Sequence, residues 1–225
     1  MKRLISILLV LLGLVATSAV VISATAGTSP TNAAEAGPSH SHASRAGSPA
    51  ANLRVTLDRL LGEHAALAMN ATNLGYSGSK SFPAAAKSVD RNSVELSKAI
   101  ASLYGAKAGN VFLNGKFQWR AHIGFFVDYT VALAKKDKQG QAKAVANLRR
   151  YTKEHGAFLA TATGLPKLAV QNDLLGHVLE LKNQLDAYAK GDYTRSTALY
   201  RDAYQHMFMT GDLLAGAIAK QKNLS

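Results

Sequence analysis

Histidines are the residues of this chain whose positions suggest chemistry. Each of four lies within the apolar stripe of a segment with helical spacing: His64, His122, His177 and His206. All four fall near the midpoints of their segments, and mid-helix positions in an up-and-down bundle share one level whichever way each helix runs. We therefore expect the four imidazoles to converge in the core and to serve as ligands for a transition metal.

Further ligand atoms are available beside two of these histidines. Asp173 and Asp202 precede His177 and His206 by four residues, so each aspartate shares a helical face with its histidine and is expected to orient the imidazole or to ligate directly. Met209 lies about one turn beyond His206, and His155 lies in the apolar stripe of its own segment; both are possible additional ligands. A mixed set of imidazole and thioether ligands favours copper, notably Cu(I), over hard cations.

Two other interpretations of the histidines remain open. Two opposed imidazoles could bind haem or its iron, and the attachment would be non-covalent because the chain has no cysteine. Alternatively the histidines, including His155 in the stripe of its own segment, are structural and bond to carbonyls, tyrosines or carboxylates. Sequence signatures of catalysis are missing, among them Gly-x-Ser-x-Gly and His-Glu-x-x-His, so we do not expect an enzyme.

The elements that must position these residues are helices. Apolar residues recur at spacings of three and four, and no stretch alternates as a strand would. The fold class is therefore predicted to be all-α, an antiparallel bundle of about six helices joined by short turns. The predicted helices cover approximately residues 51–75, 81–104, 110–136, 141–163, 167–190 and 193–221, with residues 137–140 as the turn between the third and the fourth. A partial echo between Leu60–His64 and Leu174–His177 is consistent with an imperfect internal duplication.

The first residues have the layout of a secretory signal. Lys2 and Arg3 precede an apolar run, residues 4–15, and small residues extend from there to Ala26. We expect cleavage after Ala26, with Ala36 as the alternative site. An uncleaved membrane anchor is the competing interpretation. In either case we expect the rest of the chain to be exported and to face outward.

Composition divides residues 27–222 into a tether and a bundle. Residues 27–50 are rich in Gly, Ser, Thr, Pro and Ala and are predicted to be a flexible tether, and residues 51–222 form the bundle domain. The formal charge of +12 falls to +10 without Lys2 and Arg3. Such a surface favours anionic cell-envelope polymers or lipid headgroups. Nucleic acid is not expected, because the basic residues at 135–153 lack interleaved exposed aromatic side chains.

Several segments also carry a family resemblance. RNSVELSKAIASLYG (91–105), WRAHIGFFVDYT (119–130), LDAYAKGDY (185–193) and AYQHMFMTGD (203–212) resemble an uncharacterised helical domain of secreted bacterial proteins. The resemblance covers about residues 53–221 and implies an exported helical domain. In some relatives this domain accompanies a copper amine oxidase-like N-terminal module, which does not occur in this sequence. The shortened motif at 174–177 is the clearest departure.

Overall fold

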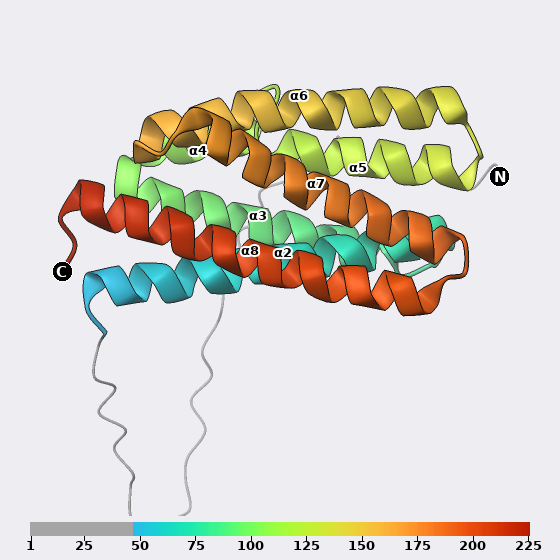
Figure 1. Ribbon diagram of the computed structural model, residues 1–225, viewed down its shortest axis with the longest axis horizontal. Helices are drawn as coiled ribbons and strands as arrows, with labels where there is room; N and C mark the ends of the chain where they lie inside the picture. Colours follow the sequence, from blue (N-terminus) through green and yellow to red (C-terminus); the bar gives the residue numbers. More distant parts are fainter. Residues whose placement is uncertain (1–46) are drawn as a thin grey trace, which may run out of the picture. The chain divides into compact units, whose positions relative to one another are not determined.

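The computed structural model describes residues 47–225, and this part of the chain is entirely helical, as predicted. Seven helices and no strand occur within it. The helices are α2 (Pro49–Tyr76), α3 (Phe82–Tyr104), α4 (Ala106–Asn114), α5 (Trp119–Ala134), α6 (Lys138–Thr163), α7 (Lys167–Ala189) and α8 (Tyr193–Lys222). Short turns join them, so the long helices run up and down beside one another (Figure 1).

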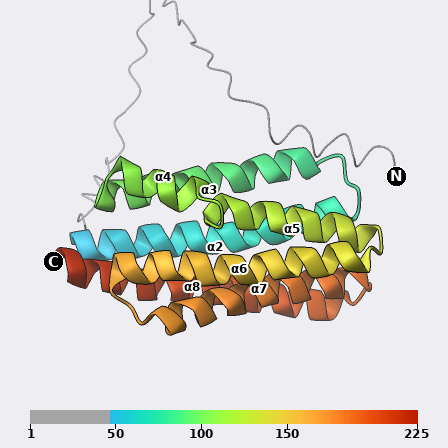
Figure 2. The ribbon, with the colours of Figure 1, turned by 90° about the horizontal axis from the view of Figure 1, so that it is seen from above.

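Five of the helices form a closed ring around the core. The order of neighbours is α2, α5, α6, α7, α8 and back to α2, and the hairpin of α3 with α4 packs on α2 and α5. Figure 2 shows α3 and α4 along one side of the bundle and α7 with α8 along the other. The helices α2, α5 and α7 run in the same direction (Figure 1). Each of these three helices contacts the other two, so their inward faces meet inside the ring.

Local sequence signals explain where the long helices begin and end. Ser48, Asp137 and Asp192 are N-caps whose side chains accept hydrogen bonds from backbone N–H groups in the first turns of α2, α6 and α8. These bonds satisfy donors that have no partner within the helix. Gly164 ends α6 in the left-handed conformation, with φ of 73°, and Pro166 precedes α7.

One predicted helix is wrong. The segment 110–136 was expected to be continuous, but the chain leaves the helix after Asn114 and resumes it at Trp119. A Cβ atom at Gly115 would lie 2.3 Å from the Cγ atom of Gln118, so any other residue in the tight turn between α4 and α5 would require the Gln118 side chain to move. Gln118 has extended backbone there, and its side chain reaches His155 on α6.

The described residues also bear on the ends of the predicted domain. Helix α2 begins at Pro49, so the last two residues of the predicted tether belong to the bundle. Within residues 47–225, no helix is both long and apolar enough to cross a bilayer. The predicted signal or anchor, residues 1–26, and the alternative cleavage site at Ala36 lie outside the described residues.

Candidate metal centre

Three of the four predicted ligands meet at the centre of the bundle. His64 on α2, His122 on α5 and His177 on α7 each offer a ring nitrogen, and these three nitrogens all lie within 4.8 Å of one another. The three side chains are buried, with at most 1% of their surface exposed. Within residues 47–225 this is the only group of three or more histidine and acidic residues with such spacing.

The closest pair of nitrogens has a separation that suits a shared metal ion. The Nε2 atoms of His64 and His122 are 3.3 Å apart. Two imidazoles bound to one ion at about 2.0–2.1 Å and near-tetrahedral angles would place their nitrogens about 3.3–3.4 Å apart. Without an ion, one ring can donate to the other across the same distance.

Several imidazole nitrogens in the cluster have no hydrogen-bond partner. They are Nδ1 of His64, Nδ1 of His122 and both ring nitrogens of His177. Buried polar side-chain atoms nearly always have a partner, and leaving one unpaired costs about 1–3 kcal/mol. An ion at the meeting point would give His177 a partner, whereas the Nδ1 atoms of His64 and His122 lie on the far side of rings whose Nε2 atoms face each other.

Aromatic rings enclose the cluster. The ring centroid of Trp119 lies 4.6 Å from that of His64 and 4.9 Å from that of His122. Tyr151 on α6 stacks on His122 at 4.5 Å with an interplanar angle of 20°. Trp119 and Tyr151 are buried, so the imidazoles lie in a water-poor setting.

This setting keeps the imidazoles neutral. Burial lowers the pKa of His64, His122 and His177 well below the ordinary value, because a buried charge loses its hydration. Neighbouring histidines lower each pKa further, because positive charges repel: His122 acts on His64, His177 and His155 act on His122, and His64 and His206 act on His177. Neutral imidazole is the form that ligates metals, so no proton has to leave before binding.

The fourth predicted ligand, His206, lies outside the cluster. Its Nδ1 atom is 2.8 Å from a carboxylate oxygen of Glu180, and its Nε2 atom is 3.3 Å from one of Asp173. Hydrogen bonds to Asp173 and to Glu180 raise the pKa of His206 to about 10. The ring is therefore an imidazolium at neutral pH, and a doubly protonated ring has no lone pair for a metal.

The carboxylates of this second group come from α7. Asp173 was expected to partner His177 on its own helix, but it binds His206 on α8 and accepts a hydrogen bond from the Thr210 hydroxyl at 2.9 Å. Glu180, which was not among the predicted residues, lies seven residues beyond Asp173 and therefore on the same face. We call His206, Asp173 and Glu180 the carboxylate triad.

The remaining predicted ligands do not reach the cluster. Met209 is 63% exposed, so its sulfur faces water rather than the core. Asp202 is exposed and makes no ion pair within residues 47–225. His155 is buried but its Nδ1 atom is 2.5 Å from Oε1 of Gln118. Burial lowers the pKa of His155 to about 3.

A small cavity adjoins the cluster. It has a volume of about 30 Å³, and His64 and His122 are among the residues that line it. Its other walls come mainly from apolar side chains such as Phe126 and Leu181. A cavity of this size holds one or two water molecules. A small fourth ligand therefore has room beside the imidazoles.

The comparisons with known proteins add no assignment. No family model, curated protein or solved structure matches this chain. The family resemblance drawn from the sequence stays a prediction, and the three imidazoles themselves are the basis for inferring a function.

Proposed function

We propose that this chain binds a transition metal ion, with copper favoured, through His64, His122 and His177. The observation that carries the proposal is the meeting of three neutral, buried imidazoles from three helices, one of which, His177, has no partner for either ring nitrogen. A structural core histidine normally finds polar partners, as both ring nitrogens of His206 do here; His155 has a partner at Nδ1 and none at Nε2. The role we propose is metal storage, sensing or homeostasis in the cell envelope.

The charge of the surroundings favours a singly charged ion. No carboxylate lies within the three-histidine cluster, and an uncompensated divalent cation in an apolar interior costs more than a monovalent one. The nearby carboxylate triad combines one positive and two negative charges, hence a net charge of −1. Cu(I) carries a single positive charge, which costs less to bury than a double charge and is balanced by the net charge of −1 on the carboxylate triad. Imidazole is among the ligands that copper accepts.

Thioether ligation no longer supports the choice of copper, because Met209 faces solvent. The structure also makes haem a weaker candidate for the ligand than the sequence did. The cavity beside His64 and His122 is about 30 Å³, far too small for a porphyrin ring. We therefore keep copper as the favoured ion and treat zinc as the competitor to be tested, since three histidines also form catalytic zinc sites.

The test is a titration of metal-free protein with Cu(I) under reducing, anaerobic conditions, and separately with Zn(II). We expect one Cu(I) per chain and a rise in melting temperature, because a ligand that binds only the folded state stabilises it. Elemental analysis of protein from copper-supplemented cells should agree. A protein that stays metal-free and whose melting temperature does not respond to either ion would contradict the proposal.

Two variants make the test specific to the cluster. His122→Gln removes one ligand, and His155→Gln is the matched control because His155 is equally buried on a neighbouring helix but lies outside the cluster. Binding should be lost in the first and kept in the second. Both are made in a His40→Ala, His42→Ala background, so that the two histidines near the N-terminus contribute nothing to the stoichiometry.

A further inference from the structure

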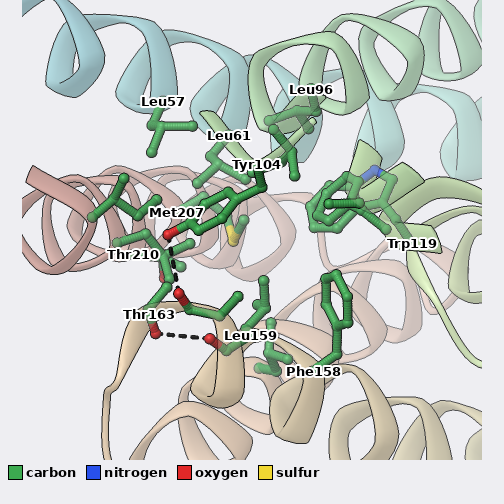
Figure 3. A pocket seen from close by; sticks show the side chains of 17 residues that line it. Leu57, Leu61, Leu96, Tyr104, Trp119, Phe158, Leu159, Thr163, Met207 and Thr210 are labelled. Carbon is green, nitrogen blue, oxygen red and sulfur yellow. Dashed lines mark hydrogen bonds between the residues drawn. The ribbon is translucent and has the colours of Figure 1, made fainter. Parts of the chain in front are cut away.

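A larger cavity lies in the core on the other side of Trp119 from the histidines. Its volume is about 100 Å³, and all seven described helices contribute to its walls. Figure 3 shows side chains from several of them, Leu57, Leu96, Trp119, Phe158 and Met207 among those labelled, around the open space. Trp119 contacts His64 and His122 as well, so it separates this cavity from the cluster.

The polar atoms at the edge of the cavity are already committed to the protein. The Tyr104 hydroxyl bonds to the carbonyl of Ala162 and to the side chain of Gln221. The hydroxyl of Thr163 donates to the carbonyl of Leu159, and that of Thr210 to Asp173. The exposed surface inside the cavity is therefore apolar, and a guest would find no free hydrogen-bond partner there.

We propose that this cavity binds a small, uncharged apolar molecule without hydrogen-bonding groups, of the size of benzene or smaller. Cavities of about 150 Å³ lined by leucine, isoleucine and phenylalanine stay dry and bind benzene or xenon. The cavity here has the same chemical lining and a somewhat smaller volume. A water molecule inside it would lack the two to four polar partners that hold buried water.

The guest can enter past half-buried side chains. Ile100, Tyr104, Ala108, Phe158 and Ala162 line the cavity and are each partly exposed, whereas the walls on the α2 and α7 sides are buried. Rotation of the Tyr104 or Phe158 side chain would open the cavity on this side without separating helices. The site does not depend on the proposed metal centre, so its test uses metal-free protein.

The experiment measures the melting temperature during titration with benzene, and the fluorescence of Trp119 under xenon pressure. Trp119 is the single tryptophan of the chain, so xenon beside it should quench nearly all the tryptophan emission. We expect a saturable rise in melting temperature, about 2–4 °C when free benzene reaches about five times its Kd. Phenol should bind about tenfold or more weakly, because its hydroxyl would be buried without a partner.

Two substitutions fill the cavity from different helices, Ala108→Leu on α4 and Ala162→Leu on α6. Each should abolish the benzene response, and Ala146→Leu, the same change at an exposed position of α6, should keep it. Xenon-induced shifts in the methyl NMR spectrum of the unsubstituted protein should map to Leu57 and Leu96. No saturable response, or an equal response in all three variants, would overturn the proposal.

Discussion

Two groups of histidines in this bundle have opposite electrostatic settings. In the three-histidine cluster, imidazoles face one another and aromatic rings, and burial lowers the pKa of each. In the carboxylate triad, His206 lies between Asp173 and Glu180 and its pKa rises to about 10. His177 and the two acidic residues all lie on α7, and His177 is about one helical turn from each of them.

The difference shows that the neighbours of a histidine decide its chemistry. A neutral ring among neutral rings keeps a lone pair that a cation can use, whereas a ring between carboxylates keeps both protons and serves as a structural cation. The same residue type in the same bundle therefore yields a candidate metal ligand at the buried centre of one face of α7 and an ion pair at the edge of that face. This contrast can be tested in four ways, from the largest expected effect to the smallest.

Removing one histidine from each group should separate them most clearly. Mutating a residue that only orients a metal ligand typically weakens metal binding about 10–100-fold. His177→Gln removes a ligand itself, so it should weaken Cu(I) binding by more than this. His206→Gln should change the affinity less than tenfold, because His206 does not ligate. Competition with a Cu(I) chelator of known affinity measures both. The opposite order of effects would show that the metal binds at the carboxylate triad.

Acid should destabilise the metal-free protein through the buried histidines. In the unfolded chain they bind protons below about pH 6.5, whereas their lowered pKa values keep them neutral in the fold. The unfolded state then binds more protons than the folded state. The free energy of unfolding therefore falls as the pH is lowered, by up to about 1.4 kcal/mol per pH unit for each histidine.

Urea denaturation at pH 7, 6 and 5 checks this slope. The His155→Gln variant should have a shallower slope, because the pKa of His155 is lowered to about 3 and this residue contributes one of the protons. A slope that is flat between pH 7 and 5 would contradict a neutral histidine core.

Alkali should destabilise the protein through His206, with the opposite sign. Its pKa is about 10 in the fold and about 6.5 in the unfolded chain. The folded state binds the extra proton, so this contribution is fully present below about pH 6.5 and is lost as the pH rises to 10. We expect a loss of about 2 kcal/mol, less than the full shift implies, because water reaches the edge of the triad.

The control for this prediction is His206→Gln, which removes the titrating group. Denaturation curves at pH 6.5, 8 and 9.5 should show the loss in the unsubstituted protein and a smaller change in the variant. An equal loss in both proteins would assign the alkaline sensitivity to other groups.

The smallest effect concerns the spacing between α7 and α8. A Cβ atom at Gly176 would lie 2.9 Å from Cε1 of His206, so Gly176→Ala should displace the imidazolium and weaken its hydrogen bonds. We expect this cost to cancel or exceed the 0.5–1 kcal/mol, roughly, that alanine gains over glycine in a helix. Gly124→Ala on α5, where a Cβ atom meets nothing within 4 Å, should show the full gain.

Thermal denaturation of the two glycine variants measures the difference. A stabilised Gly176→Ala protein would mean that His206 moves aside freely, and the carboxylate triad would then be less rigid than its hydrogen bonds suggest.

The periodicity of apolar residues was sufficient to predict all the long helices except for the break after Asn114, and the burial of four histidines. His64, His122, His155 and His177 all occupy apolar stripes, and all are buried. The break between α4 and α5 was missed because apolar residues continue across Gly115 without a proline, and the tight turn depends on a contact with Gln118 that spacing does not reveal.

Which histidines belong to the cluster could not be predicted from the sequence. It depends on the rotation of each helix about its axis and on which helices are neighbours. His206 lies at the edge of the buried face of α8, beside Gly176, so it meets the flank of α7 instead of the centre of the bundle. The (i, i+4) spacing correctly placed Asp173 on the side of His177, but a carboxylate at the edge of that face turns to a charged partner on α8. A single-helix pattern does not contain that partner.

The burial of His64, His122 and His177 has a kinetic consequence. These residues are more than 50 positions apart along the chain and at most 1% exposed, so no fragment with one or two of their helices contains the whole site. An ion would enter and leave only when the bundle opens locally, at a rate set by the free energy of that opening. Exchange would therefore be slower than at an exposed site, and an ion bound during folding would leave slowly.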